Sequence, residues 1–319
     1  MNPAHAARPE ARRASLLARM SGEARGSGVP ARRIHLVVAI DRLLARLLDG
    51  TAPGSWVVTG GYANQLRRSV SARSTEDLDL RIEAEIDAAP ALLAAGFAVD
   101  LQDGFAYDVT TAATPLQGPP GGGLRFAVVS RLAGAPLVQF KVDVSTGDVI
   151  VGELEAHRSD PVLERLGLVR SQFPVYPVAQ HVAEKLHALT LPRDVANSRA
   201  RDLVDLAWFS RQFTFGSGAL IDACVATFAR RATHVWPPSV SNPPADWEKP
   251  YGRWRAELGL QDRTPRDAVA SIESFLDPVF AGVRDLRWDP SRSTWDAGRL
   301  STLPPAPSPS PGASSVPKG

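Results

Sequence analysis

The amino-acid sequence predicts an α/β (α+β) fold, in which a mixed sheet with flanking helices is followed by a helical C-terminal half. Apolar residues recur at helical spacing between residues 14 and 49. Short apolar or alternating segments bounded by turn residues, which are typical of strands, follow between residues 56 and 151. Helical periodicity returns beyond about residue 175. The chain of 319 residues is 44% hydrophobic and 22% charged, so it can bury a sizeable core.

The first half of the chain is expected to form a domain over residues 14–172. It opens with two helices, which are separated by glycines and a proline at residues 26–30. A strand over residues 56–59 then runs into Gly60, and a helix follows. The further expected elements are a strand at 78–82, a helix at 87–95 that Gly96 stops, and strands at 97–99, 106–109, 124–129 and 137–144.

The second half is expected to form a helical domain over residues 173–300. Its predicted helices are 178–189, 200–212, 219–233 and 265–283. A segment rich in tryptophan and proline, at residues 236–254, is expected to be a packed loop. Residues 302–319 are rich in proline and serine and cannot build a core, so a disordered tail is expected there.

Composition excludes several classes of protein. The single cysteine, Cys224, excludes an internal disulfide framework and a cysteine-based zinc cluster. No apolar run approaches the roughly 18 residues that a membrane helix needs. The start of the chain also lacks the apolar segment of a signal peptide. We therefore expect a cytoplasmic protein with no membrane partner.

Charge is nearly balanced but unevenly placed. The net charge is only +2, so no global field draws the protein onto nucleic acid. Arginines gather between residues 8 and 33, and residues 1–13 are expected to be a disordered basic arm. A solvated surface and a contact with an RNA backbone are both open interpretations of this stretch. Only four of the 36 basic residues are lysine, so a lysine inside a predicted element is a candidate for function.

A glycine pair and an acidic pair suggest a phosphate and metal site. Gly60 and Gly61 follow an apolar strand, where glycines let backbone N–H groups approach an anion at a helix N-terminus. Asp77 and Asp79 are separated by one residue on a predicted strand, so both carboxylates project to the same face. Two carboxylates so close repel each other unless a cation lies between them. Oxygen ligands of this kind suit Mg²⁺, which binds a few carboxylates together with substrate phosphates.

A third carboxylate is expected to join this pair. Asp143 lies on an apolar strand that should be internal to the sheet, where an unpaired carboxylate is costly. If its strand neighbours the one that carries Asp77 and Asp79, three carboxylates surround one or two ions. That arrangement is typical of two-metal phosphoryl transfer, in which one ion activates the attacking hydroxyl and the other steadies the triphosphate. We therefore expect Asp143 to be a metal ligand beside Asp77 and Asp79.

The helical half contributes a basic and acidic cluster. Lys185 lies on a predicted helix and, as a compact ammonium, suits a triphosphate. Asp202 and Asp205 are one helical turn apart, and their simplest role is pairing with Arg199, Arg201 or Lys185. A solvated surface lysine remains an equal alternative for Lys185 on these observations alone.

Five segments together resemble a known family. They are Gly60-Gly61, residues 73–80, residues 142–148, residues 182–189 and residues 197–206, and they occur in that order. This series resembles the AbiEii/AbiGii-type nucleotidyltransferase toxins of bacterial toxin–antitoxin and abortive-infection systems. The two leading helices are similar to that family's opening, so the resemblance covers roughly residues 14–230.

The resemblance implies a fold, an activity and a set of site residues. The fold is a polymerase-β-like nucleotidyltransferase domain with a helical C-terminal half. The activity is transfer of a nucleotide from an NTP with Mg²⁺ (or Mn²⁺) as cofactor, and the acceptor is RNA, in particular the 3′ end of tRNA. A cognate antitoxin is the implied partner. The nucleotide-binding residues are Gly60, Gly61, Thr75, Lys185 and Arg199. The catalytic residues are Asp77, Asp79, Lys185, Asp202 and Asp205.

Three functions stay open at this point. In the first, the protein is a toxin that modifies tRNA and blocks translation, with Arg199, Arg201 and the arginine-rich start of the chain contacting the RNA backbone. In the second, the same chemistry acts on a protein or a small molecule. In the third, the chain is a non-enzymatic interaction protein, which the presence of Asp77, Asp79 and Lys185 together disfavours.

Overall fold

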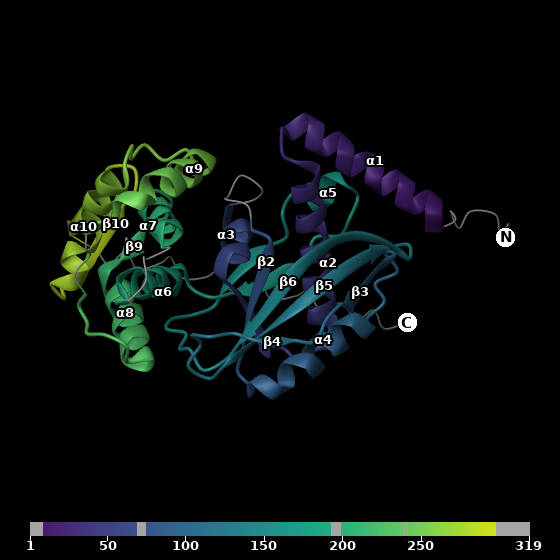
Figure 1. Ribbon diagram of the computed structural model, residues 1–319, viewed down its shortest axis with the longest axis horizontal. Coiled ribbons are helices and arrows are strands. Elements are labelled where there is room, and N and C mark those ends of the chain that lie inside the picture. The colour runs from purple at the N-terminus through teal and green to yellow at the C-terminus, as the bar shows by residue number, and fades with distance from the viewer. Residues whose placement is uncertain (1–8, 69–74, 193–198, 239, 241, 298–319) are drawn as a thin grey trace, which may run out of the picture.

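The structure is a computed structural model that describes residues 9–68, 75–192, 199–238, 240 and 242–297. Figure 1 shows two parts side by side, a sheet with its helices and, at one end of it, a bundle of helices. The expected tail at residues 302–319 and the first eight residues of the expected basic arm lie outside the described residues. None of the helices in the described ranges has the length and hydropathy needed to cross a membrane.

A mixed sheet forms the first part, as the sequence predicts. The strands run in the order β3-β5-β6-β2-β1-β8-β7, with β4 at the side of β5. The pairs β2–β6 and β1–β8 are parallel, and the other pairs are antiparallel. The strands are β1 Trp56–Thr59, β2 Asp77–Ile82, β3 Phe105–Val109, β4 Thr114–Pro115, β5 Gly123–Leu132, β6 Ala135–Ser145, β7 Glu155–Arg158 and β8 Gln172–Val175.

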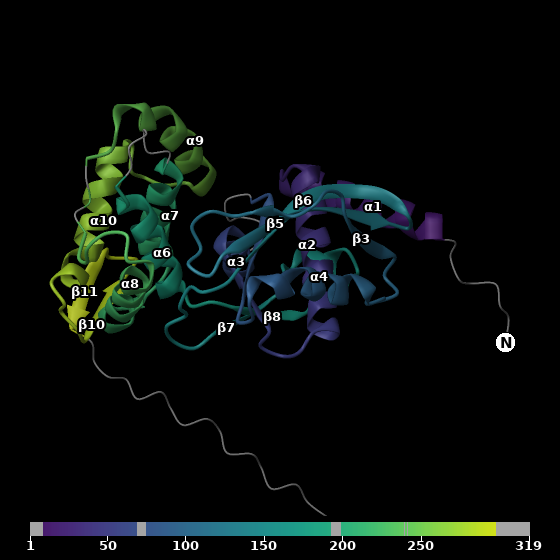
Figure 2. The same cartoon turned by 60° about the horizontal axis from the view of Figure 1, so that its bottom comes forward.

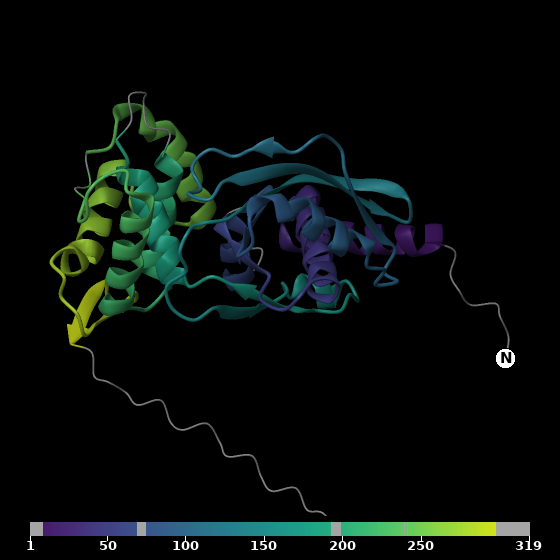
Figure 3. The ribbon, with the colours of Figure 1, turned by 90° about the horizontal axis from the view of Figure 1, so that it is seen from below.

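Helices cover this sheet and fill its curvature. Helix α2 contacts strands β3, β6 and β8, so the sheet curves around it, as Figure 3 shows from below. Residues 36–47 of this helix are all buried, so it is enclosed on every side over that stretch, while Leu48 of the predicted stripe is exposed. The helices of this part are α1 Pro9–Ser27, α2 Ala31–Gly50, α3 Gly60–Arg68, the short 3₁₀ helix η2 Ile86–Ala88, α4 Ala89–Ala98 and α5 Val162–Arg165.

Two expectations about this part are wrong. Helix α1 begins at Pro9, so residues 9–13 are helical and do not belong to a disordered arm; proline suits the first turn and the following residues are good helix formers. Gly96 does not stop helix α4, which continues to Ala98, so the strand expected at 97–99 is absent from this described stretch. A Cβ atom on Gly96 would lie 2.6 Å from Leu47 of α2. Gly96 therefore serves the close packing of two helices.

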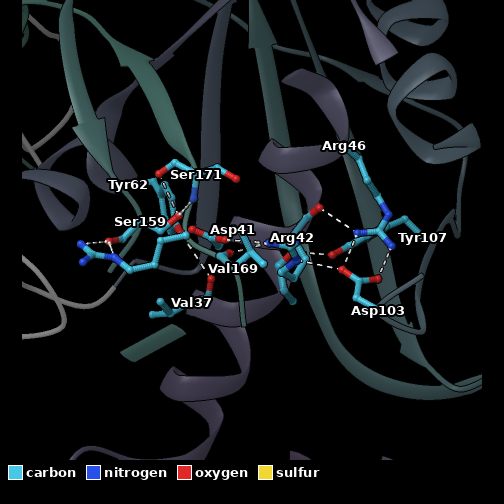
Figure 4. Close-up of polar contacts among 12 residues, drawn as sticks. Val37, Asp41, Arg42, Arg46, Tyr62, Asp103, Tyr107, Ser159, Val169 and Ser171 are labelled. Carbon is cyan, nitrogen blue, oxygen red and sulfur yellow. Dashed lines mark hydrogen bonds and ion pairs between the residues drawn. The ribbon is translucent and has the colours of Figure 1, made fainter. Parts of the chain in front are cut away.

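A polar network lies inside the apolar contact of helix α2 with the sheet (Figure 4). Arg42 Nε donates to Asp103 Oδ2 at 2.8 Å, and Arg46 Nη2 donates to Asp103 Oδ1 at 2.5 Å. Arg46 Nη2 also donates to the carbonyl of Phe105 at 2.8 Å. These charge-assisted bonds pair two buried guanidinium groups, although Arg46 Nε has no partner among the described residues, and they fix α2 relative to strand β3.

The second part is helical, as expected, with one addition. Predicted helices correspond to α6, α7, α8 and α10, but α9 begins within the segment expected to be a loop and continues beyond it. A small sheet, which periodicity does not predict, places buried Trp288 opposite Trp295, and Trp288 Nε1 donates to the carbonyl of Ser210 at 2.6 Å. The elements are α6 Val178–Thr190, α7 Ala200–Gln212, β9 Phe215–Gly216, α8 Ser217–Arg231, the 3₁₀ helix η3 Ala245–Trp247, α9 Glu248–Leu258, α10 Pro265–Phe280, β10 Leu286–Asp289 and β11 Thr294–Ala297.

The two parts have separate hydrophobic cores. The first core ends at Tyr176 and the second begins at Ala179. Strand β8 pairs with β1 and belongs to the first part, so the boundary expected at residue 172 falls a few residues too early. Periodicity could not place it, because β8 is short and contains Pro174. In Figure 2, helix α6 stands beside helix α3, at the end of the sheet that carries the predicted site.

Candidate active site

Two glycines form the corner between strand β1 and helix α3. Gly60 has a φ of +58°, and a Cβ atom on it would lie 2.0 Å from Asp79 Oδ2, so only glycine fits without strain. The N–H of Gly60 donates to the hydroxyl of Tyr176 at 3.2 Å, and that of Gly61 donates to Asp79 Oδ2 at 3.3 Å. Contact of Gly60 and Gly61 with phosphates stays a prediction. The structure gives them a further role, which is close approach to Asp79.

Thr75 connects this corner with strand β2. Its hydroxyl donates to the carbonyl of Asp77 at 3.1 Å. A Cβ atom on Gly61 would lie 2.8 Å from the Thr75 Oγ1, so the threonine and the helix corner pack directly together. Thr75 thus helps to fix the start of the strand that carries the acidic pair, and its contact with a nucleotide stays a prediction.

The acidic pair lies on one face of strand β2, as its spacing predicts. Buried and partly exposed residues alternate along β2, so Leu78 and Leu80 enter the core while Asp77 and Asp79 face the other side. Strand β6 runs parallel beside it, with Asp143 in register with Asp79. The sheet therefore brings all three predicted carboxylates to the same place.

Their mutual repulsion affects protonation. Burial, followed by the nearby charges of Asp143 and Asp77, raises the pKa of Asp79 to about 6. Burial also raises the pKa of Asp77, and the Asp143 charge adds to the shift. A divalent cation between Asp77 and Asp79 would relieve this repulsion, so the donor set fits an ion such as Mg²⁺.

Asp143 differs from the other two carboxylates because it is already paired. Arg125 of strand β5 donates to both of its oxygens, from Nε to Oδ1 at 2.7 Å and from Nη2 to Oδ2 at 2.6 Å. This bond raises the pKa of Arg125 further above its usual value. Within the ranges that the structure describes, no group of three acidic, histidine or cysteine side chains is arranged to hold a metal ion. Asp143 as a metal ligand therefore stays a prediction.

The basic and acidic cluster of the helical part forms as predicted. Lys185 of α6 lies between two carboxylates of α7, with Nζ at 2.7 Å from Asp202 Oδ1 and 3.0 Å from Asp205 Oδ2. Arg199 Nη1 lies 3.3 Å from Asp202 Oδ2. The side chains of Asp202 and Asp205 are 6% and 2% exposed, so Lys185 and Arg199 together balance two nearly buried charges. Two partners hold the ammonium in one position.

One cavity of about 330 Å³ unites these two clusters. All the predicted site residues line it except Asp205, which acts on it through Lys185. The lining residues are Gly60, Gly61, Thr75, Asp77, Asp79, Arg125, Asp143, Tyr176, His181, Glu184, Lys185, Ala188, Arg199, Arg201, Asp202 and Arg231.

Sequence reasoning missed several residues of this cavity. Arg125 and Arg231 carry no signal in a chain whose basic residues are nearly all arginine. The hydroxyl of Tyr176 accepts a hydrogen bond from the Gly60 N–H. Tyr176 lies far along the chain from Gly60, and only the pairing of β8 with β1 brings the two residues together. Glu184 is adjacent to Lys185, and burial raises its pKa to about 7 in spite of the nearby Arg231.

The match to known proteins agrees with this geometry. The family model described as nucleotidyl transferase AbiEii toxin, type IV toxin–antitoxin system, matches residues 42–292, which is most of the chain. The chain belongs to this AbiEii family. Its predicted membership is therefore confirmed.

Solved structures and curated sequences add less. MenT4, a nucleotidyltransferase toxin from Mycobacterium tuberculosis, is similar with a TM-score of 0.50 and 20% identity, covering 83% of this chain and 99% of that one. JHP933 from Helicobacter pylori has a TM-score of 0.41 and 12% identity, covering 77% of this chain and 93% of that one. At such identity the MenT4 likeness supports the fold alone. No curated protein matches this chain.

For an AbiEii-family nucleotidyltransferase, the residues predicted to hold a cation and those predicted to contact a triphosphate lie on opposite sides of the cavity. The carboxylates Asp77 and Asp79 lie on the sheet side, and Lys185, Arg199 and Arg201 lie on the helical side. A bound cation at the sheet side and a triphosphate between the two sides would place opposite charges next to each other. A nucleotide together with a divalent ion would suit this arrangement of charges.

Proposed function

We propose that this protein transfers a nucleoside monophosphate from an NTP to an RNA acceptor, the 3′ end of tRNA, and so blocks translation. Membership of a nucleotidyl transferase toxin family supports the transfer and the toxin role. The observation that carries the chemistry is the facing arrangement of Asp77 and Asp79 with Lys185 across one cavity. Acting on tRNA would place the protein in the cytoplasm, and the type IV family gives an antitoxin as its partner.

The acidic pair and the lysine would have separate roles in the reaction. Asp77 and Asp79 would hold the divalent ion, Mg²⁺ or Mn²⁺, which when bound supplies positive charge at the triphosphate. Lys185 is held by Asp202 and Asp205, and its ammonium would stabilise the negative charge of the leaving pyrophosphate. The acceptor hydroxyl oxygen forms a bond to the α-phosphorus, the bond to pyrophosphate breaks, and a proton is released.

Cations at the cavity rim suit an RNA acceptor. Arg199 and Arg201 line the cavity on helix α7 and the turn before it. Arg201 also stacks over the ring of Trp254 at 5.0 Å, so helix α9 helps to hold its guanidinium in place. Phosphate contacts by these arginines would weaken as salt rises, because binding releases counterions.

A transfer assay tests the proposal directly. The protein is incubated with each α-labelled NTP, Mg²⁺ and total tRNA, and label is followed in RNA, protein and small molecules. Label at the tRNA 3′ end that requires Asp77 supports the proposal. Label in protein or small molecules, with none in RNA, would show that the acceptor is not RNA. Growth inhibition that persists unchanged in an Asp77→Ala variant selects a non-enzymatic role.

A further inference from the structure

Three charged residues lie in a row across three neighbouring strands. Asp143 of β6 is in register with Asp79 of β2 on one side and with Arg125 of β5 on the other. Residues in register on paired strands project to the same face of a sheet. The row Arg125, Asp143, Asp79 therefore lies on the floor of the cavity, with a cation at one end and a carboxylate at the other.

The carboxylate in the middle of this row, Asp143, binds Arg125 through both of its oxygens. Its two oxygens accept bonds of 2.7 Å and 2.6 Å from Arg125, in the bidentate geometry that is strongest between these groups. The Asp143 side chain is 13% exposed and that of Arg125 is 37% exposed, so solvent reaches this pair mainly from the arginine side. A second metal ion at Asp143 would lie against a guanidinium that bears the same sign of charge.

The charges at the site also favour a single divalent cation. The Asp143–Arg125 pair is neutral as a unit, which leaves two negative charges, on Asp77 and Asp79. One divalent cation balances these two charges. A second cation between Asp79 and Asp143 would require the Arg125 pair to break, and the positive charge at that end of the row is already supplied by Arg125.

We propose that Arg125 holds Asp143 in this ion pair and so limits the centre to one divalent cation, bound by Asp77 and Asp79, with its guanidinium in place of a second ion. The inference rests on the proposed function, because it concerns the cation of nucleotidyl transfer. It replaces the expectation that Asp143 is a metal ligand. It also assigns to Arg125 a positioning role, since it acts through Asp143.

Metal counting tests the proposal without reference to activity. The full chain is mixed with one equivalent of an NTP analogue whose α–β bridging oxygen is an imido group, using each of the four bases in turn. Mn²⁺ is then titrated in, and free Mn²⁺ is measured by electron paramagnetic resonance. We expect one Mn²⁺ per chain. Two Mn²⁺ per wild-type chain overturn the proposal.

Three variants identify the residue that sets the count. Arg125→Gln releases Asp143, and we expect the count to rise to two. Asp143→Asn is expected to keep it at one, and the double variant to return it to one. Arg284→Gln is the matched control, because Arg284 also contacts both oxygens of an aspartate, Asp222, on an exposed surface. Its count should stay at one.

The outcomes separate this inference from the proposed function. A count of one in Arg125→Gln overturns the role of Arg125. If that variant does not fold, the counts of the wild type and of Asp143→Asn still test the proposal. Two Mn²⁺ per wild-type chain and one per Asp143→Asn chain would make Asp143 a ligand and overturn the proposal. A count of one without label in any acceptor leaves the cation site standing and refutes the proposed reaction. Mn²⁺ that is bound no more tightly with the chain present than by the analogue alone refutes both.

Discussion

The corner glycine offers the sharpest test of how the site is built. In Gly60→Ala, the new Cβ atom would lie 2.0 Å from Asp79 Oδ2 and 2.5 Å from its Cγ. Such separations are far below van der Waals contact, so the carboxylate must move away. Gly60 also has a φ of +58°, where a side chain is strained. The collision acts on a carboxylate that we propose as a metal ligand, and the strain acts on the backbone of the corner itself.

The magnitude follows from these two effects. The left-handed backbone conformation costs a non-glycine residue about 1 kcal/mol. Displacing Asp79 also weakens its bond from the Gly61 N–H, and a bond to a charged group contributes about 1.5 kcal/mol. We therefore expect a loss of unfolding free energy of about 2 to 3 kcal/mol. A displacement of about 1 Å at a reacting centre lowers the rate by about 100-fold, so kcat should fall by at least that factor.

Gly54→Ala is the matched control. Gly54 has a φ of +79°, and a Cβ atom on it would meet nothing within 4 Å. It shares the backbone strain of Gly60 and not the collision with Asp79. Urea unfolding should show a loss of about 1 kcal/mol in Gly54→Ala, and label transfer to tRNA should be unchanged. Equal transfer by Gly60→Ala and Gly54→Ala would refute the reasoning.

Three further predictions concern charged groups. Lys185→Ala should lower the unfolding free energy by about 3 kcal/mol, measured in urea, because it leaves Asp202 and Asp205 nearly buried without their shared ammonium; unchanged stability would contradict this. Mn²⁺ affinity should fall about tenfold per pH unit below pH 6, since the pKa of Asp79 is about 6 and protons then compete for its oxygens; a pH-independent affinity would count against it. Burial opposes the shift, but bonds from neighbouring groups lower the pKa of Glu155 to about 2. The ionised carboxylate of Glu155 therefore stabilises the fold fully above its ordinary pKa of 4.5, and this stabilisation is lost as the pH falls from 4.5 toward 2. Glu155→Gln should flatten this part of the plot of unfolding free energy against pH. An unaltered plot would show that Glu155 is not the source of this pH dependence.

Local patterns in the sequence are sufficient to predict much of the site. The alternation around Asp77 and Asp79 predicts their common face, and the spacing of Asp202 and Asp205 on a helix predicts that both can reach one partner. These features depend on residues only a few positions apart. Periodicity is strongest at that range, so the long helices and the central strands are predicted well.

Features that depend on distant pairing are the ones missed. Strand β8 has four residues, and a single register pair, Val58 with Val175, joins it to β1. The small second sheet requires Phe215 to lie opposite Trp288, which is far along the chain. The role of Arg125 depends on its register with Asp143, which no local pattern contains. Long-range register therefore limits what this sequence predicts.

The cavity exists only where the two separately cored parts meet, so the joint between them sets its geometry. Glu155 accepts from Arg67 of helix α3 and, at 2.7 Å, from the N–H of Val178 at the start of α6. Arg67 also donates to the carbonyl of Tyr176. These bonds tie the last turn of α3, the helix that begins at the glycine corner, to the first turn of the helix that carries Lys185. Changes at the joint should therefore lower the rate of transfer even when both cores stay folded, because the distance between cation site and ammonium depends on it.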